Sequence, residues 1–412
     1  MVQSEFFRLL PVSEALTLWL DGLPRMERCE HLPTARALGR VLAEAPRSAL
    51  ALPQFPRSAM DGYAVRAEDT YGASPNLPAY LRVVGRVPMG QAASQSISSG
   101  EALEIATGAM LPPGASAVVM VEKTQDIGGG DLEVHGPVAP GENVVQVGED
   151  VAEGAEILPV GHTLRPQDLG GLLACGITEV KVIARPRLAL VGSGDELVAP
   201  DQQPAPGQIR DINSYVLAAL FEQMGGEVLH MGIARDDFDD LYQRAANGLA
   251  QADVLVLTAG SSISTRDLTS AVINKLGAPG VIQHGLAVKP GKPTILGRSE
   301  GKAVIGLPGN PVSAYCVARR MIGPLIRHLL GQRPRHAAIL SARLSANVPS
   351  KAGREDTIPV KLTHDERSLW ATPLFGKSNL IFTLIEADGL LTVPLNSGGL
   401  LAESLVDVEL FA

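Results

Sequence analysis

The stretch LAVKPGKPTILGRSEGKAVIGLPGNPVSA, residues 286–314, decides how this chain can fold. It contains two short apolar runs, at 286–288 and 303–307, which have the length of buried strands. Each run leads into a loop punctuated by proline and glycine, KPGKP after the first and GLPGNP after the second. We therefore expect two buried strands whose following loops open on the same edge of one sheet.

The two loops carry groups that can hold an anion. The first contributes Lys289 and Lys292, and the second ends where a helical pattern begins. Asn310 can cap that helix, and Pro311 suits its first turn. The first N–H groups of a helix have no partner within it, so its N-terminus attracts negative charge. The stretch thus predicts an anion site made of two lysines and a helix N-terminus.

Length and charge restrict what else the chain can be. With 412 residues it is long enough for several domains. Its 35 Lys and Arg and 44 Asp and Glu give a net charge of −9, and only 4% of its residues are aromatic. Nucleic-acid binding proteins are typically basic or rich in stacking aromatics, so we expect no nucleic-acid partner. The anion site is a local feature of an acidic protein.

Three further observations concern the compartment. Cys29, Cys175 and Cys316 are far apart and lack the spacing of metal ligands. The N-terminus has no basic region followed by an apolar stretch and a cleavage site. No run approaches the ~20 apolar residues of a membrane span. These features predict a cytoplasmic protein with reduced thiols and no membrane contact.

Changes in the predicted secondary structure along the sequence divide the chain into five segments. Residues 1–52 and 149–185 are predicted to form one helical and extended linking domain, into which a β-rich domain at 53–148 is inserted. Residues 186–333 alternate strands and helices, as expected for a parallel α/β sheet. Residues 334–412 contain only short strand patterns and predict a small all-β domain.

Periodicity within these segments predicts individual elements. Ser13 is expected to cap the first helix and Asn213 the fourth, and GGG at 128–130 to form a turn between two strands. The helices are expected at 12–20, 32–42, 167–175, 213–224, 238–249, 266–276 and after 311. The strands are expected at 81–87, 102–105, 117–121, 188–191, 228–232, 253–258, 338–344, 356–362, 369–373, 390–393 and 406–411.

Two further loops of the α/β segment are expected at the edge that carries the two lysines. One is GSGDEL, after the strand at 188–191, and the other is AGSSISTRD, after the strand at 253–258. Glycines and hydroxyls suit a phosphate, and carboxylates beside a phosphate indicate Mg²⁺. The residues singled out in these loops are Ser193, Asp195, Glu196, Gly260, Ser261, Ser262, Ser264 and Asp267.

Long motifs in chain order resemble the MoeA family, the molybdopterin molybdenumtransferases related to the E domain of gephyrin. The resemblance covers nearly the whole chain. The motifs are SAMDGYAV at 58–65, TGAMLPPGASAVVMVE at 107–122, GED at 148–150, GSGDEL at 192–197, GQIRDIN at 207–213, KPGKP at 289–293 and GLPGNPVSA at 306–314.

The resemblance implies a fold and an activity. It implies an elongated homodimer of four-domain chains, each with a parallel α/β molybdopterin-binding domain and a small C-terminal β-barrel. It also implies insertion of molybdate into adenylylated molybdopterin, assisted by Mg²⁺, with release of AMP and formation of molybdenum cofactor. Molybdopterin adenylyltransferase and molybdoenzyme apo-proteins would be transient partners.

The resemblance also implies roles for single residues. Lys289 and Lys292 would hold the oxyanion, touched also by Arg354 and Ser378. Asp61, Thr107 and Asp150 would reach the cleft of the partner subunit. Asp237 is favoured over its neighbour Asp236 as a further acidic residue. Mg²⁺ would be held by Asp61, Asp150, Glu196 and Asp267. Substrate would be bound by Thr107, Ser193, Gly260, Ser261, Ser262, Ser264, Pro308, Asn310, Pro311, Ser313, Arg354 and Ser378.

The chain departs from the family pattern around the anion site. The loop at 259–267 carries Ser261 and Ser262 where the family has glycine and valine. His284 and Gly285 stand where a basic residue is common, and residues 144–147 lack the usual arginines. Three alternatives follow: a tungstate-inserting paralogue, a non-catalytic carrier of the pterin, and a scaffold protein.

Overall fold

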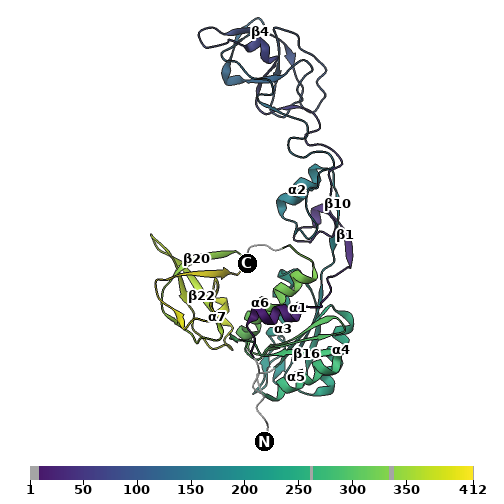
Figure 1. The fold of residues 1–412 in the computed structure, drawn as a ribbon, viewed down its shortest axis with the longest axis vertical. Coiled ribbons are helices and arrows are strands. Elements are labelled where there is room, and N and C mark those ends of the chain that lie inside the picture. Colours follow the sequence, from purple (N-terminus) through teal and green to yellow (C-terminus); the bar gives the residue numbers. More distant parts are fainter. Residues whose placement is uncertain (1–8, 260–262, 334–337, 412) are drawn as a thin grey trace.

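The computed structural model describes residues 9–259, 263–333 and 338–411, except for the side chains of residues 259 and 263–266. Figure 1 shows an elongated molecule. A β-rich domain lies at one end, a slender linking region follows it, and an α/β domain and a small barrel lie side by side at the other end. Among the described helices none is both long and apolar enough to cross a membrane.

The α/β domain is built on one six-stranded sheet with helices on both faces. Four neighbouring strands are parallel, and β18 runs antiparallel to them. In sheet order the strands are β14 (Glu227–Ala234), β11 (Arg187–Ser193), β15 (Val254–Ala259), β19 (Lys302–Pro308), β18 (Ile295–Ser299) and β16 (Pro279–His284). The helices are α3 (Asn213–Gln223), α4 (Phe238–Gln251), α5 (Ile263–Leu276) and α6 (Pro311–Leu329).

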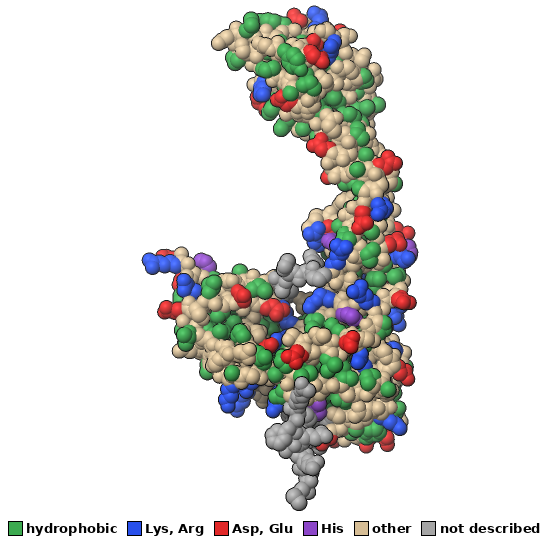
Figure 2. Space-filling view, in the orientation of Figure 1, with side chains coloured by type: hydrophobic (Ala, Val, Ile, Leu, Met, Phe, Trp, Pro, Cys, Tyr) green, Lys and Arg blue, Asp and Glu red, His purple; other side chains and the backbone are tan. Residues whose placement is uncertain are grey.

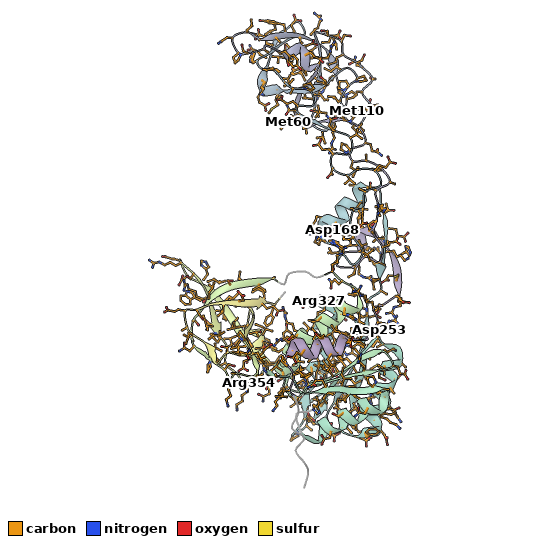
Figure 3. The ribbon with its side chains drawn as sticks, in the orientation of Figure 1. Met60, Met110, Asp168, Asp253, Arg327 and Arg354 are labelled. Atoms are coloured by element: carbon orange, nitrogen blue, oxygen red, sulfur yellow. The ribbon has the colours of Figure 1, made fainter. Side chains whose placement is uncertain are left out.

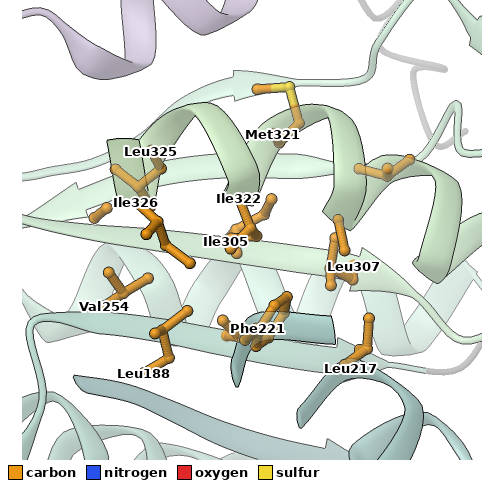
Figure 4. Packing of buried hydrophobic residues seen from close by; sticks show 14 of the residues in the cluster. Leu188, Leu217, Phe221, Val254, Ile305, Leu307, Met321, Ile322, Leu325 and Ile326 are labelled. Carbon is orange, nitrogen blue, oxygen red and sulfur yellow. The ribbon is translucent and has the colours of Figure 1, made fainter. Parts of the chain in front are cut away.

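The largest apolar core lies between this sheet, α3 and α6. Figure 4 shows Phe221 of α3 and Ile322 of α6 packed over Ile305 of β19, and all three side chains are fully buried. Burying one such side chain stabilises the fold by roughly 1.5–3 kcal/mol. Helix α1 (Val12–Leu20) joins the same core, where the buried indole of Trp19 donates to the carbonyl of Gly297 at 2.8 Å.

The anion loop reaches the predicted edge by a different route. The expected strand at 286–288 is wrong: β17 (Val288–Lys289) pairs with the barrel strand β22 and is absent from the six-stranded sheet. The KPGKP loop instead precedes β18, whose first residue, Ile295, pairs with Gly306 near the end of β19. Because β18 is antiparallel to β19, the loop still lies at the carboxyl edge of the parallel strands.

The inserted domain is a six-stranded sheet, mostly antiparallel. The expected turn at residues 128–130 joins its last two strands, β7 and β8, as predicted. In sheet order the strands are β6 (Ala117–Met120), β3 (Gly62–Val65), β5 (Glu101–Ile105), β4 (Ala79–Arg86), β8 (Asp131–Val134) and β7 (Thr124–Gly128). Strands β2 (Arg57–Ser58) and β9 (Val144–Val145) pair separately.

The linking region holds α2 (Pro166–Ala174), as predicted, and a two-stranded sheet of β1 (Cys29–Pro33) and β10 (Glu179–Ile183). The expected helix at 32–42 is wrong. Only one 3₁₀ turn, Thr34–Arg36, forms there, because Val41 and Leu42 instead bridge to Thr163 and Val182. Long-range pairing therefore overrode the apolar periodicity.

The C-terminal domain is a closed five-stranded β-barrel. The order is β22 (Glu355–His364), β23 (Leu369–Pro373), β20 (Ile339–Leu344), β26 (Leu405–Leu410) and β24 (Gly389–Val393), and β24 pairs back with β22. All five strands match expected ones. A short helix α7 (Phe382–Ile385) and the pair β21 (Val348–Pro349) and β25 (Gly399–Leu400) were not expected.

Two of the expected helix caps are wrong. Ser13 lies inside α1, whose N-cap is Pro11, because the helix begins at Val12. Asn213 is the first residue of α3 rather than its cap, and its amide donates to the carbonyl of Gly309. The predicted domain boundaries at residues 52, 148, 185 and 333 stay predictions, although α1 packs on the α/β domain rather than in the linking region.

A buried carboxylate, Asp168, organises the start of α2 (Figure 3). Its Oδ2 accepts from the Arg165 backbone N–H at 2.8 Å and lies 2.7 Å from His162 Nε2. Its Oδ1 accepts from Arg165 Nη2 at 2.8 Å. Burial by itself raises the pKa of Asp168, but the hydrogen bonds from Arg165 and His162 outweigh it and hold the pKa well below its usual value.

We expect Asp168→Asn to destabilise the linking region by about 2 kcal/mol at pH 7, since it removes the charge that these donors need. A depressed folded pKa gives stability that is present above the unfolded pKa and is lost as the pH falls toward the folded pKa. The gap between wild type and variant should therefore shrink from pH 7 to pH 3. Urea unfolding at both pH values measures it, and a constant gap would contradict the assignment.

Candidate active site

A cleft of about 850 Å³ separates the α/β domain from the barrel. Both domains contribute predicted site residues to it. From the α/β domain come Lys289, Lys292, Pro308, Asn310 and Ser313, and from the barrel come Arg354 and Ser378. The fold thus gathers into one cavity predicted residues from segments far apart in the sequence, such as Lys289 and Ser378.

The two lysines stand on a loop that is fixed at several points. Lys289 belongs to β17, whose register places it opposite Asp356 of β22. The carbonyl of Lys292 accepts from Leu286 N–H at 2.9 Å. Between them, Gly291 has φ +110°, and a β-carbon there would come within 2.1 Å of Val317 Cγ2 in α6. Glycine is needed here because the loop presses against the helix.

Arg354 lines the cleft, and part of its guanidinium group is already paired with a carboxylate of the barrel. Its Nε donates to Asp356 Oδ1 at 2.8 Å and its Nη2 to Asp356 Oδ2 at 3.2 Å. Asp356 is 3% exposed, so this bidentate pair is the group that satisfies a buried carboxylate. The Nη1 group takes no part in the pair and leaves Arg354 with N–H donors for an anion. Figure 3 places Arg354 at the junction of the two domains.

The predicted helix N-terminus is that of α6, and residues of the barrel form hydrogen bonds with it. Asn310 is the N-cap residue of α6, yet its side chain makes no cap bond and donates instead to Ser378 Oγ at 3.1 Å. The N–H of Val312 donates to the Ser378 carbonyl at 3.1 Å. Pro311 opens the helix as predicted. The expected capping role of Asn310 is therefore wrong, because the amide joins the helix to the barrel.

The acidic groups predicted near the strand ends lie outside this cleft. Ser193 donates to Asp236 Oδ1 at 3.1 Å, and the Asp236 N–H donates to Asp195 Oδ1 at 3.2 Å. Asp237 caps α4 by accepting from the N–H groups of residues 239 and 240. Of the two neighbours, Asp236 is thus the one beside the GSGDEL loop, and a site role for Asp237 stays a prediction.

Glu196 and Asp267 are also not among the residues that line the cleft. The Glu196 carboxylate lies against Gly194, where a β-carbon would come within 2.6 Å of Oε2. Asp267 is exposed in the second turn of α5. Gly260, Ser261 and Ser262 lie outside the described residues, and Ser264 lies in α5 with a side chain that is likewise not described. Their predicted roles stay open.

The inserted domain carries a separate pair of predicted residues. Asp61 Oδ1 accepts from the Thr107 N–H at 2.7 Å and from its hydroxyl at 3.1 Å. These two hydrogen bonds lower the pKa of Asp61. The next residue, Gly62, has to be a glycine, because a β-carbon there would come within 1.9 Å of the Val119 carbonyl oxygen. Asp150 is exposed, and its N–H donates to the carbonyl of Leu52.

This pair lies far from the cleft of its own chain. Met60, next to Asp61, and Met110 are labelled in the upper domain of Figure 3, whereas Arg354 lies at the opposite end of the molecule. The four predicted Mg²⁺ ligands are therefore divided, since Glu196 and Asp267 belong to the α/β domain, Asp61 to the distant inserted domain and Asp150 to the linking region next to it. Within the described part of one chain, no three His, Cys, Asp or Glu side chains gather as a metal site. The predicted Mg²⁺ site stays a prediction.

Among the residues of the cleft that sequence reasoning missed are Lys351, Phe375 and Lys377. A signal for them existed, because Lys351 stands three residues before Arg354 and Lys377 directly precedes Ser378. The sequence alone could not show that these residues matter, because it does not reveal that both segments face the lysines of the α/β domain.

We expect Arg354→Gln to destabilise the barrel by about 2–3 kcal/mol, because it leaves the buried carboxylate of Asp356 without its counter-charge. Lys289→Ala serves as the control and should change stability by less than about 0.5 kcal/mol, since Lys289 is exposed. Thermal unfolding of both variants measures the difference. Equal stability of Arg354→Gln and wild type would show that the pair is not structural.

Comparison with known proteins bears on this architecture. The model of the MoeA N-terminal region (domain I and II) matches residues 10–176. The model of a probable molybdopterin binding domain matches residues 189–328, and that of the MoeA C-terminal region (domain IV) matches residues 341–411. The three models follow one another along the chain and together cover most of it.

Similar proteins cover the chain as a whole. Molybdopterin molybdenumtransferase 2 of Mycobacterium tuberculosis is 35% identical over 380 residues, 90% of this chain and 92% of that protein. Molybdopterin molybdenumtransferase of Haemophilus influenzae is 34% identical over 352 residues, 84% and 85% of the two chains. The crystal structure of the molybdopterin biosynthesis MoeA protein from Pyrococcus horikoshii OT3 has a TM-score of 0.87 at 31% identity and covers 98% of this chain and 100% of its own. Matching models, relatives and fold confirm the resemblance seen in the motifs: this chain belongs to the MoeA family.

Proposed function

We propose that this protein inserts molybdate into adenylylated molybdopterin, releasing AMP and forming molybdenum cofactor. The single observation that supports it best is the cleft that joins Lys289 and Lys292 to Arg354 and Ser378. An acidic chain with a net charge of −9 here offers a locally basic cavity. The relatives named molybdopterin molybdenumtransferase support the choice of substrates.

The cleft residues suit a tetrahedral dianion such as molybdate. Both lysines are exposed to the cleft and supply two positive charges, which match the charge of the anion. The Nη1 group of Arg354 and the Ser378 hydroxyl add donors from the opposite domain. Donors fixed in this way hold molybdate where the dithiolene sulfurs of the pterin can reach it, with no side-chain nucleophile required.

The oxygen donors of the GSGDEL loop fit Mg²⁺, a cation that prefers carboxylates. Gly194 leaves the space that the Glu196 carboxylate occupies, and the carboxylate of Asp195 accepts from the Asp236 N–H. Glu196 would hold the ion, with Asp267 from the second turn of α5. When bound, Mg²⁺ neutralises charge on the phosphoanhydride that is cleaved as AMP leaves.

The proposal includes a homodimer, because one chain does not assemble the whole predicted site. Asp61 and Thr107 form a hydrogen-bonded pair on the inserted domain, far from the cleft of their own chain. A second copy would present its Asp61, Thr107 and Asp150 to this cleft. A closed two-fold dimer gives two equivalent sites, each built from both subunits.

The proposal also includes the pathway context. Molybdopterin adenylyltransferase would supply the adenylylated substrate, and apo-molybdoenzymes would receive the product. The cytoplasmic location stays a prediction that agrees with the three unpaired thiols.

Lys289→Ala and Lys292→Ala should each reduce molybdate-dependent AMP release by at least about 100-fold while the protein stays folded, because the anion loses a fixed counter-charge. Lys361→Ala is the matched control, since Lys361 is exposed on β22 but does not line the cleft. AMP release from adenylylated molybdopterin measures the effect. Full activity in both cleft variants would refute the oxyanion assignment.

Mixed dimers test the shared site. Asp61→Asn and Lys292→Ala should each be inactive alone, but unfolded and refolded together they should recover about a quarter of wild-type activity, because half of the dimers then contain one intact site of two. Asp61→Asn mixed with Asp267→Asn should give the same recovery. Absence of recovery, with mixed dimers verified by mass, would show that each chain works alone.

A further inference from the structure

The cleft carries more positive charge than one molybdate requires. Among the described residues that line it, the cations are Lys289, Lys292, Lys351, Arg354 and Lys377, and the only carboxylate is Asp356. Arg354 and Asp356 neutralise each other through their bidentate pair. None of the four lysines forms an ion pair with a described residue. The described lining residues therefore carry a net positive charge of four, twice the charge of a molybdate dianion.

The four lysines stand on two walls of the cleft. Lys289 and Lys292 belong to the segment between β16 and β18 of the α/β domain. Lys351 and Lys377 belong to two loops of the barrel, one after β21 and one after β23. Figure 2 shows basic side chains along the lower border of the barrel, close to the α/β domain. The barrel thus adds a second pair of lysines, Lys351 and Lys377, which the proposed oxyanion site does not use.

Both barrel loops are held in place by backbone hydrogen bonds. Beside Lys351, Ser350 N–H donates to the Gly398 carbonyl at 2.9 Å, and Gly353 N–H donates to the Leu395 carbonyl at 2.8 Å. Beside Lys377, Ser378 is joined to the N-terminus of α6 through its carbonyl and its hydroxyl. The backbone on which the two lysines stand is thus held in place, which limits the loop ordering needed to bind a small dianion.

A third residue of the barrel, Phe375, indicates which kind of chemical group carries the bound dianion. Phe375, two positions before Lys377, lines the cleft and is 63% exposed. An exposed aromatic ring beside a cation is a platform on which a flat heteroaromatic ring can stack. A phosphate ester that bears such a ring would satisfy Phe375 and the two lysines together.

We propose that Lys351 and Lys377 bind a phosphate ester group of the substrate, with Phe375 against its ring, at a subsite separate from the molybdate site. The inference rests on the proposed function, whose substrate carries phosphate on both its pterin part and its nucleotide part. Molybdate at Lys289 and Lys292 and a phosphate ester at Lys351 and Lys377 together account for all four unpaired lysines. The chemistry is shared by the two phosphates, and binding measurements distinguish them.

The test uses the full-length protein and isothermal titration with three probes: molybdate, AMP and a pterin monophosphate. The double variant Lys351→Gln/Lys377→Gln should bind at least one phosphate ester about tenfold more weakly, from about threefold per exposed lysine, and molybdate within about twofold of wild type. Lys361→Gln, exposed on the same barrel but outside the cleft, should bind all three probes as wild type does.

The pattern of losses identifies the ester. A loss for AMP alone assigns the subsite to the nucleotide, and a loss for the pterin monophosphate alone assigns it to the pterin. Phe375→Ala should weaken the same probe and leave molybdate unchanged. Unchanged ester binding in the double variant, or an equal loss for molybdate and esters, overturns the proposal. Because binding requires no turnover, a wild type that binds the ester but releases no AMP would refute the proposed reaction and leave the subsite standing.

Discussion

The junction between the barrel and helix α6 is the constraint on which the site depends. Val312, Cys316, Leu384 and Leu390 form a buried apolar cluster across it, so the two domains are packed rather than merely linked. Around this cluster, Ser378 binds the N-terminus of α6, and β17 pairs with β22. Apolar burial supplies most of the free energy of such a junction, and the polar bonds fix its register. Without this docking the two lysines would face water, and no cleft would exist.

Charge is distributed to suit that geometry. The chain as a whole is acidic, which keeps it from binding polyanions unspecifically. In the cleft the only carboxylate among the described lining residues is paired with Arg354, so the lysines are not neutralised by the protein itself. Arg354 therefore has two tasks, since it satisfies a buried carboxylate and also offers its remaining N–H groups to the cavity. Under the proposed function, a substitution there would change both the stability of the barrel and anion binding.

The elongated shape explains why one chain holds an incomplete set of predicted residues. The inserted domain is carried away from the cleft by the linking region, in which Asp168 organises the start of α2. In the proposed dimer this separation would let the inserted domain present Asp61 and Thr107 to the cleft of a second copy. The hydrogen bonds that hold Asp61 ionised keep it ready for a cationic or donor partner.

The sequence by itself determined the alternating strands and helices of the α/β domain, the barrel strands, the family and the residues of the anion loop. Local periodicity and long motifs carry that information. Only the tertiary structure decided that β17 joins the barrel, that residues 32–42 are not helical, and that Asn310 binds Ser378 instead of capping α6. It also placed Lys351, Phe375 and Lys377 opposite Lys289. The physical reason is common to all four: each depends on contacts between segments far apart in the chain, and such contacts outweigh local propensity without leaving a periodic trace in the sequence.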